Sequence, residues 1–244
     1  MTPDGYWAGA ASIGGPMATV VPAGEPAVTS WRVVRVGALV ELLASGVGPV
    51  RGRPRIVAVD GRSASGKSTL ASRLVRAVPR SAVVHTDDLA WHEPLYIWGD
   101  LLADAVLRPL REGRALAYRP PQWDVRGREG AIEVPAGLDL VVIEGTGASH
   151  REHAGLLDAT VWVQADAAEA ERRGIARDIA EGVNGGPEEA TAFWHAWMAE
   201  ELRFFERQRT WERADVVVHG TPDRALADDE VEIAVGPLDG PIGS

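Results

Sequence analysis

The chain has 244 residues, of which 45% are hydrophobic, so it can bury one sizeable core, and a single domain of about 200 residues is its natural size. A net charge of −10 argues against long-range attraction to nucleic acid or to an anionic membrane, and we expect neither as a partner. Cysteine is absent, which excludes disulfides and thiolate metal sites and suits a reducing compartment. With no secretory signal or membrane-length apolar run in the sequence, we expect a cytoplasmic protein.

The two ends of the chain differ in composition from the rest. The first thirty residues are rich in Gly, Ala and Pro, and we expect residues 1–30 to be a flexible extension. Residues 31–222 then form the folded domain. Residues 223–244 contain the run Asp228-Asp229-Glu230 and a Gly/Pro-rich end, which favours an acidic tail, either a short strand or a frayed end.

The folded domain begins with a helical pattern. Val36, Leu39, Val40 and Leu43 are spaced for one face of a helix within residues 31–46. A Gly/Pro-rich linker follows this segment. The helix is therefore expected to pack beside the sheet, ahead of its first strand.

The next segment, residues 55–69, carries the most specific motif of the chain. A short apolar run that predicts a buried strand breaks into Gly-x-x-x-x-Gly-Lys-Ser, and a helical period follows. In this context the glycines allow backbone angles that a side chain forbids, and successive N–H groups point at phosphate oxygens. The residues expected to bind the phosphates are Gly61, Ser63, Ala64, Ser65, Gly66, Lys67, Ser68 and Thr69. Lys67 should reach the β- and γ-phosphates as a catalytic cation, and the Ser68 hydroxyl should ligate Mg²⁺.

The use of basic residues supports this motif. Of the 25 Lys plus Arg residues, 24 are arginines, and the sole lysine is Lys67. An ammonium is a slender point charge that can enter a backbone nest too tight for a planar guanidinium. The lysine therefore stands at the one position of the chain whose predicted chemistry requires it.

The rest of the chain alternates strands with helices. Strands are predicted at residues 56–59, 81–85, 138–143, 159–163 and 215–218, and helices at residues 99–111 (kinked or ended by Pro109), 167–181 and 188–208. Such alternation implies a parallel sheet whose ligands gather at the carboxyl ends of the strands. We therefore predict an α/β P-loop NTPase fold with a five-stranded, mostly parallel sheet and helices on both faces.

Carboxylates stand at the ends of three predicted strands, at this edge of the sheet. Near a γ-phosphate, such a group either accepts the proton of an attacking hydroxyl or holds Mg²⁺, directly or through water. We assign Asp87 as the catalytic base, with a helix N-cap as the alternative. For Asp88 we favour the helix N-cap, with the catalytic base as the alternative. Glu144 follows an apolar strand and is assigned to Mg²⁺. Asp60 lies behind the loop, and we expect a structural role or a distant contact with Mg²⁺.

An arginine cluster follows the fourth strand. Arg172, Arg173 and Arg177 lie on one predicted helix, and the last two share a face. A solvated face whose arginines pair with neighbouring carboxylates is one interpretation. Because phosphoryl transfer needs positive charge on the γ-phosphate from outside the loop, we favour an arginine lid, with Arg173 and Arg177 catalytic and Arg172 on the nucleotide.

These motifs occur in the order seen in the uridine kinase and phosphoribulokinase group of P-loop kinases, which the chain resembles over roughly residues 50–222. The resemblance is carried by the phosphate loop, Thr86-Asp87-Asp88, Val142-Ile-Glu-Gly145, Arg172-Arg-Gly-Ile-Ala-Arg-Asp178 and Ala214-Asp-Val-Val-Val218. It implies ATP and Mg²⁺ as cofactors, Asp87 as base, Glu144 near the metal and residues 172–178 as a lid. It also implies that Gly220 and Thr221 lie near adenine.

Aromatic residues after the second strand are candidates for the acceptor site. The candidates for an aromatic acceptor pocket are Trp91, Tyr96, Trp98, Tyr118 and Trp123, with a place in the core or as loop anchors as the alternative for each; of these, Trp91, Tyr118 and Trp123 are assigned to substrate binding. Uridine kinases carry a Pro-x-Tyr-Asp-Phe segment, similar to residues 121–125 here, and soon afterwards a histidine that helps to read the base. Arg128 stands at about that position, and we assign it to substrate binding; an anionic acceptor is an alternative to a nucleoside.

Two further groups of residues are expected to lie outside the catalytic centre. An apolar stripe near helical spacing is expected to be core, or a buried homodimer face, rather than a cofactor site; its members are Phe193, Trp194, Trp197, Met198, Leu202 and Phe205. The histidines show no metal-ligand spacing. His150 and His153 follow Glu144 closely enough to enter the site, but we favour a position outside it.

The sequence thus predicts a kinase that moves the γ-phosphate of ATP to a hydroxyl of a nucleoside or a similar small metabolite. The alternative is a nucleotide-binding switch or NTPase in which water is the acceptor. The chain lacks an Asn/Thr-Lys-x-Asp motif for reading guanine and has both a candidate base and a candidate arginine lid. These features favour the kinase.

Overall fold

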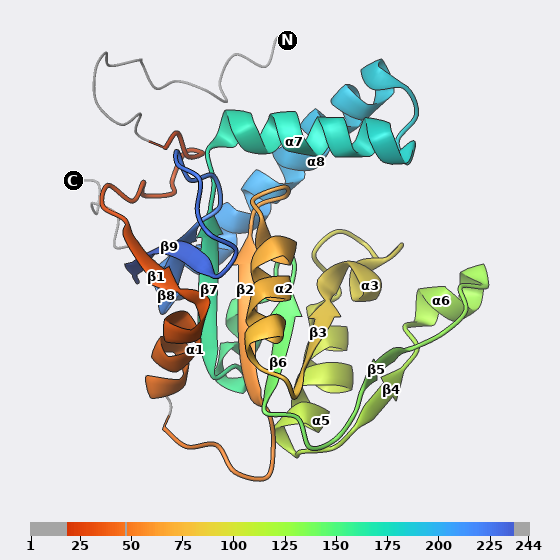
Figure 1. The fold of residues 1–244 in the computed structure, drawn as a ribbon. Coiled ribbons are helices and arrows are strands. Elements are labelled where there is room, and N and C mark those ends of the chain that lie inside the picture. Colours follow the sequence, from red (N-terminus) through yellow and green to blue (C-terminus); the bar gives the residue numbers. More distant parts are fainter. Residues whose placement is uncertain (1–18, 47, 237–244) are drawn as a thin grey trace.

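The computed structural model describes residues 19–46 and 48–236, which fold around one twisted sheet (Figure 1). Within these ranges the sheet has seven strands in the order β1-β9-β8-β7-β2-β6-β3. The strands are β1 (Arg32–Arg35), β2 (Arg55–Gly61), β3 (Ser81–His85), β6 (Leu140–Glu144), β7 (Ala159–Gln164), β8 (Val216–His219) and β9 (Glu230–Val235). Strands β3, β6, β2, β7 and β8 are parallel, whereas β9 pairs antiparallel with both β8 and β1.

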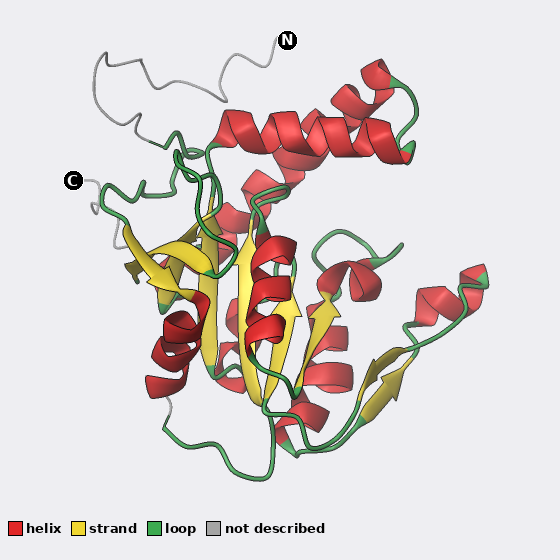
Figure 2. Cartoon of the chain, viewed as in Figure 1, coloured by secondary structure: helices red, strands yellow, loops and turns green. Residues whose placement is uncertain are grey.

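Helices cover both faces of this sheet (Figure 2). One face carries α1 (Val36–Ser45) and α2 (Lys67–Ala77); the other carries α4 (Gly99–Leu101), a π-helical turn (Leu102–Leu107), α5 (Arg108–Arg111) and α8 (Pro187–Gln208). The remaining helical elements are α3 (Thr86–Ala90), α6 (Pro121–Arg126), α7 (Ala167–Glu181) and the 3₁₀ segments Arg151–Leu156 and Thr210–Arg213. Successive side chains of β2 point to opposite faces of the sheet and therefore belong to two separate parts of the core. Val57 packs in the same cluster as Leu74, whereas Ile56 packs in the same cluster as Leu102.

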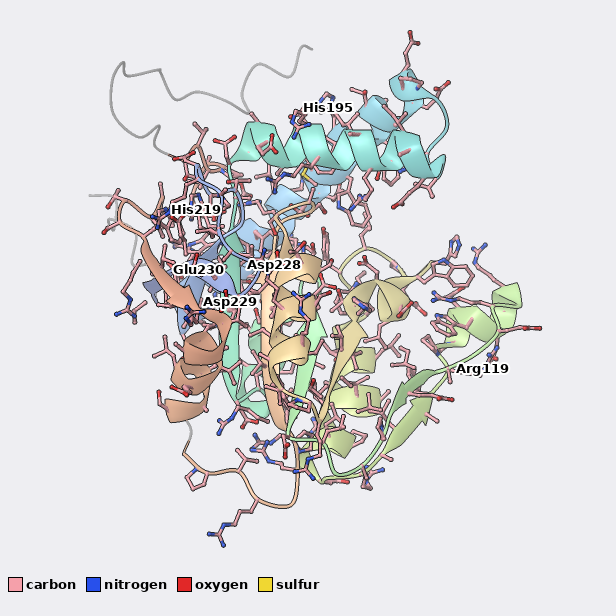
Figure 3. The ribbon with its side chains drawn as sticks, viewed as in Figure 1. Arg119, His195, His219, Asp228, Asp229 and Glu230 are labelled. Carbon is pink, nitrogen blue, oxygen red and sulfur yellow. The ribbon has the colours of Figure 1, made fainter. Side chains whose placement is uncertain are left out.

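The five predicted strands are the five parallel ones, but the count of five was too low for the described residues. The sheet is extended at one edge by β9 and β1. β1 is four residues long and continues directly into α1, so its valines merge with the helical spacing that follows. β9 lies between β1 and β8, and its residues Val231, Glu232 and Ile233 are all buried. Residues 230–235 therefore form the short strand that was one alternative for the acidic tail, and Figure 3 shows Asp228, Asp229 and Glu230 near β1, where Asp229 pairs with Arg35.

Residues 19–30 also pack against the sheet, in contrast to the expected flexible extension. Glu25 is buried, and its carboxylate accepts hydrogen bonds from the indole of Trp162 at 2.7 Å, the amide of Gln164 at 2.9 Å and Nε of Arg62 at 2.9 Å. This carboxylate fixes the segment to β7. Residues 1–18, to which the same expectation applied, lie outside the described residues.

Two features frame the carboxyl edge of the sheet. The hairpin of β4 (Leu116–Tyr118) and β5 (Ile132–Val134) forms, with α6, an arm that extends beside β3, and Figure 3 labels Arg119 on it. On the other side, α7 lies across the carboxyl ends of the strands and packs on α8 (Figure 1). None of the helices in residues 19–46 and 48–236 has the length and apolarity needed to cross a bilayer.

Candidate active site

The loop between β2 and α2 has the shape of a phosphate cradle. Ala64 and Gly66 have φ angles of 56° and 99°, which turn the chain back over its own start. A Cβ on Gly61 would come within 2.7 Å of the carbonyl oxygen of Val163, so a side chain does not fit between β2 and β7. Gly66 is the N-cap of α2, and the N–H groups of the loop and of the first helical turn therefore open onto one space.

The side chain of Lys67 lies inside this loop. The residue is 7% exposed, and its Nζ donates a hydrogen bond to the carbonyl oxygen of Arg62 at 2.7 Å. A neutral carbonyl thus holds the ammonium on the inner side of the loop. Its positive charge is one of the causes that lower the pKa of Glu144 across the site.

Glu144 is hydrogen bonded on both of its oxygens. The Ser68 hydroxyl donates to Oε1 at 3.1 Å, and Nδ1 of His85 lies 2.6 Å from Oε2. Burial alone would raise the pKa of Glu144, but the hydrogen bond with His85 and the charge of Lys67 lower it below its ordinary value. The same hydrogen bond raises the pKa of His85. An ionised carboxylate beside a hydroxyl offers two of the oxygen ligands that Mg²⁺ prefers.

Asp87 and Asp88 begin α3 but have different surroundings. Oδ1 of Asp88 pairs with Nη2 of Arg128 at 2.5 Å. Asp87 is exposed and lines a cavity of about 740 Å³ next to the phosphate loop. In the described residues α3 has no side-chain cap bond, so the capping role weighed for both residues is absent there. The position of Asp87 leaves its carboxylate open to a ligand.

Asp60 occupies the position behind the loop that the sequence indicated. Its buried carboxylate accepts hydrogen bonds from the N–H groups of Gly61, Gly147 and Ser149 at 2.8–3.0 Å and from the Ser149 hydroxyl at 2.7 Å. These bonds join the end of β2 to the turn after β6. The arrangement is that of a structural carboxylate.

The three arginines of α7 separate into two groups. Arg173 and Arg177 line the cavity of about 740 Å³, whereas Arg172 does not. Arg173 donates to Glu169 at 2.7 Å and to the carbonyl oxygen of Gly220 at 3.0 Å, and Arg177 pairs with Asp178 at 2.8 Å. The Arg172 side chain is 69% exposed and also pairs with Glu169. Hydrogen bonds from Arg172 and Arg173 lower the pKa of Glu169 to about 2, and Arg172 thus fits the solvated face that was the alternative.

The cavity brings together residues that are distant in the sequence. It contains the loop residues 63–69, Asp87, Glu144, the two arginines of α7, and aromatic side chains of α8. A second hollow of about 210 Å³ adjoins it on the other side of the loop, where it is lined by Gly66, Thr69, Arg173, Gly220 and Pro222, among others. Thr221 is turned away: its hydroxyl accepts a hydrogen bond from the Asp166 N–H at 2.8 Å and fixes the loop to the start of α7.

The predicted acceptor residues do not form one pocket. Trp91, Tyr96 and Trp98 line a third cavity, of about 350 Å³, but Tyr118 and Trp123 are not among its walls. Trp123 is buried, and its indole donates to the carbonyl oxygen of Asp88 at 2.9 Å. The guanidinium of Arg128 lies over the Trp123 ring at 3.7 Å while pairing with Asp88, so this arginine anchors the arm to α3. Burial and, secondarily, the charge of Glu93 raise the pKa of Tyr118.

Helix α8 contributes residues that sequence reasoning did not assign to the site. Trp194, Met198 and Phe205 are buried as expected, but Trp194 also lines the cavity, together with Phe193 and Trp197. Glu201 is fully buried and accepts hydrogen bonds from the N–H and hydroxyl of Ser63, at 2.9 and 2.7 Å. The indole of Trp197 donates to the same hydroxyl at 3.0 Å. A glutamate within an otherwise apolar helical stripe was the signal that could have identified Glu201.

His150 and His153 lie outside the cavity at the phosphate loop. Both are buried, and their rings stack at a centroid separation of 5.4 Å. Burial lowers the pKa of both, that of His153 to about 4. Both rings are therefore neutral near pH 7 and pack behind the turn that follows β6.

No protein-family model matches the sequence, and a search of curated proteins gives no match. Solved structures that are similar to the chain include a possible uridine kinase from Bacillus stearothermophilus, at 20% identity with a TM-score of 0.47. That match covers 75% of this chain and 96% of the other. A D-glycerate 3-kinase from Cryptococcus neoformans var. grubii is similar at 15% identity with a TM-score of 0.48, covering 76% of this chain and 94% of the other.

Proposed function

We propose that the protein is an ATP-dependent kinase that phosphorylates a hydroxyl group of a small molecule. The observation that carries this proposal is the position of Asp87, which lines both the cavity at the phosphate loop and the cavity of about 350 Å³ beside it. Thr146 and Trp197 also line both. A carboxylate at the junction of a phosphate site and a second cavity is placed to act on an acceptor hydroxyl as it meets the transferring phosphate.

The residues present fit ATP and Mg²⁺. Residues 63–69 of the loop line the cavity of about 740 Å³, and Lys67 supplies the positive charge within the loop. The Ser68 hydroxyl and the Glu144 carboxylate are the oxygen donors that would hold the metal ion. The hollow beside Gly220 and Pro222 would receive the nucleoside end of ATP. When bound, ATP supplies the phosphoryl group and Mg²⁺ offsets the negative charge of its phosphates.

The side chains around the cavity then have separate roles. Asp87 accepts the proton of the acceptor hydroxyl as the acceptor oxygen forms its bond to the γ-phosphorus and the bond from phosphorus to the leaving ADP oxygen breaks. Lys67 stabilises charge from inside the loop, and Arg173 and Arg177 do so from α7. The rings of Phe193 and Trp197 cover this side of the cavity, which limits access of water to the transferring group.

The test is ATP consumption measured without and with a panel of hydroxyl compounds. The proposal predicts slow turnover alone and faster turnover with at least one acceptor. Turnover that no compound stimulates would instead support an NTPase in which water is the acceptor. The variant Lys67→Ala serves as the control for the site, because it removes the cation of the loop; ATP turnover equal to that of the parent would contradict the assignment of the loop.

A further inference from the structure

The residues that line the cavity of about 350 Å³ beside Asp87 indicate which class of ligand it can bind. Its walls include the aromatic residues Trp91, Tyr96, Trp98 and Trp197, and its acidic residues are Asp87 and Glu93. None of the described residues that line it is Lys or Arg. The cavity is thus aromatic and negatively charged. The adjoining phosphate site also contains carboxylates, but it holds the positive charges of Lys67, Arg173 and Arg177, which this cavity lacks.

The arginine of the neighbouring arm is already engaged. Arg128 pairs with Asp88 at 2.5 Å and lies over the rings of Trp123 at 3.7 Å and Trp91 at 5.3 Å. Freeing it for an anionic ligand would break an ion pair and two ring contacts at once. The remaining titratable side chains in the cavity wall are Tyr96 and His92, and the ring of His92 packs edge to face on Trp91 at 4.5 Å.

Glu93 is the acidic residue of this cavity that the proposed reaction does not use. It is half-buried, and the hydrogen bonds and ion pairs of the described residues include no partner for its carboxylate. A neutral ligand that covered this carboxylate would remove water from an unpaired charge, which is unfavourable. An ammonium group would supply the missing partner, and ring faces nearby attract cations.

The backbone supports a built cavity. His92 and Tyr96 are non-glycine residues with φ angles of 60° and 59°, a conformation that side chains seldom adopt. These two turns fold the segment between α3 and α4 so that its aromatic residues meet Trp197 of α8; the Tyr96 and Trp197 ring centroids are 6.2 Å apart. Tyr96 also stacks on Phe204 at 4.1 Å. The segment is thereby held against α8.

From these observations we infer that the acceptor is a hydroxyl compound that carries a basic amine and an apolar or aromatic body, with Glu93 as the counter-ion of the amine. This inference rests on the proposed kinase function and specifies its substrate class. Carboxylates and phosphate esters are disfavoured as ligands of this cavity, because its described wall contains two carboxylates and neither Lys nor Arg. The net charge of −10 also favours the approach of a cationic ligand.

The experiment uses three compounds that share a phenyl ring and a primary alcohol and differ in one group: phenylglycinol (ammonium), styrene glycol (hydroxyl) and tropate (carboxylate). Binding of each to the full chain is measured from tryptophan fluorescence, since Trp91 and Trp197 line the cavity. We expect phenylglycinol to bind about tenfold more tightly than styrene glycol, as one charge-assisted contact provides, and tropate to bind most weakly.

The variant Glu93→Gln keeps the shape of the side chain and removes its charge, so it should abolish the preference for phenylglycinol over styrene glycol. Glu129→Gln is the matched control, because it removes the same charge from an exposed position outside the cavity and should keep the preference. Equal or tighter binding of styrene glycol or tropate to the parent, a preference that persists in Glu93→Gln, or no binding by any of the three would overturn the inference.

Phosphorylation of the same compounds is then measured with ATP and Mg²⁺. Transfer confined to neutral or anionic acceptors, in this set or in the wider panel, would overturn the charge assignment while leaving the kinase intact. Failure of the kinase function would give a different result. The three compounds would bind in the expected order, but no hydroxyl compound would be phosphorylated, and the cavity would then be a cation-binding site without kinase activity.

Discussion

At the scale of single residues, Glu144 and its two hydrogen-bond partners determine how the site would hold a metal ion. Its carboxylate is ionised because His85 and Lys67 outweigh the effect of burial. The Ser68 hydroxyl donates a hydrogen bond to one oxygen of this carboxylate at 3.1 Å. When a metal ion binds, the hydroxyl would give up this hydrogen bond and ligate the ion. The pair belongs to β6 and to the first turn of α2, so the parallel sheet brings it together.

We expect Glu144→Gln to raise the Mg²⁺ concentration that gives half-maximal ATP-dependent transfer, because an amide is a weaker ligand than a carboxylate for this cation. Higher Mg²⁺ should recover part of the lost rate. The measurement is a titration of rate against Mg²⁺ for parent and variant. Identical Mg²⁺ dependence in the two proteins would remove Glu144 from the metal site.

Glu201 of α8 holds the phosphate loop in place through Ser63. Its two hydrogen bonds hold Ser63, and its replacement by Ala would leave the partly buried Ser63 N–H without a partner. Since such a loss is worth about 1–3 kcal/mol, we expect Glu201→Ala to weaken ATP binding by about tenfold or more. Calorimetric titration with ATP checks this. Glu200→Gln, at an exposed ion pair with Arg203 on the same helix, is the control and should bind as the parent does; equal weakening in both variants would contradict the role of Glu201.

At the scale of elements, the hairpin of α7 and α8 positions the arginines. The two helices meet at Gly174, where a Cβ would come within 1.9 Å of the Trp194 ring. The glycine therefore sets the separation of the helices. Arg173 precedes it directly, and Arg177 follows about one turn later. The close approach thus determines where both guanidinium groups stand above the loop.

Gly174→Ala should move α7 away from α8, lower the rate of phosphate transfer and destabilise the fold by about 1–3 kcal/mol through overpacking. Gly37→Ala is the matched control, since it is also helical but a Cβ there meets nothing within 4 Å. That substitution should be neutral or slightly stabilising. Transfer rates and urea unfolding of both variants decide the matter. A Gly174→Ala variant with the parent's rate would show that the separation of the helices is unimportant.

Element by element, the sequence allowed the parallel strands, the phosphate loop and the helices at 167–181 and 188–208 to be predicted, because each depends on a local pattern of apolar spacing and glycine. The order of the seven strands could not be predicted, because β1 and β9 become part of the sheet only by pairing with segments that are distant in the sequence. The place of Phe193 and Trp197 was missed for a related reason. A helical stripe shows which face is apolar, and it does not show that part of this face covers a cavity.

At the scale of the whole molecule, a buried ion-pair cluster at the opposite edge of the sheet joins three segments. The Asp158 side chain is fully buried and accepts hydrogen bonds from Arg53 at 2.6 and 2.8 Å, from Arg111 at 2.9 Å and from the Ile56 N–H at 2.9 Å. Burial alone would raise the pKa of Asp158, but these partners lower it below its ordinary value of 3.8. The carboxylate must therefore be ionised for the cluster to hold.

Because the pKa of Asp158 is lower in the folded chain than in the unfolded one, its contribution to stability is present above about pH 4 and is lost as the pH falls further. We expect Asp158→Asn to lower the free energy of unfolding by about 3 kcal/mol near pH 7, with a smaller difference from the parent near pH 3. Urea unfolding at both pH values measures this. Asp139→Asn, at an exposed pair with Arg80, should change little; a difference that does not depend on pH would contradict the role of the Asp158 charge.

The proposed kinase function depends on Asp87, which would take the proton of an acceptor hydroxyl at the junction of two cavities. Its most direct test is the rate at which phosphorylated acceptor forms in parent and Asp87→Asn at saturating ATP and Mg²⁺, with ATP binding measured alongside. Since the amide keeps the shape and loses the basicity, we expect ATP to bind with nearly the parent's affinity while acceptor phosphorylation falls by roughly 10²–10⁴-fold. Phosphorylation at the parent's rate in Asp87→Asn would contradict this role of Asp87.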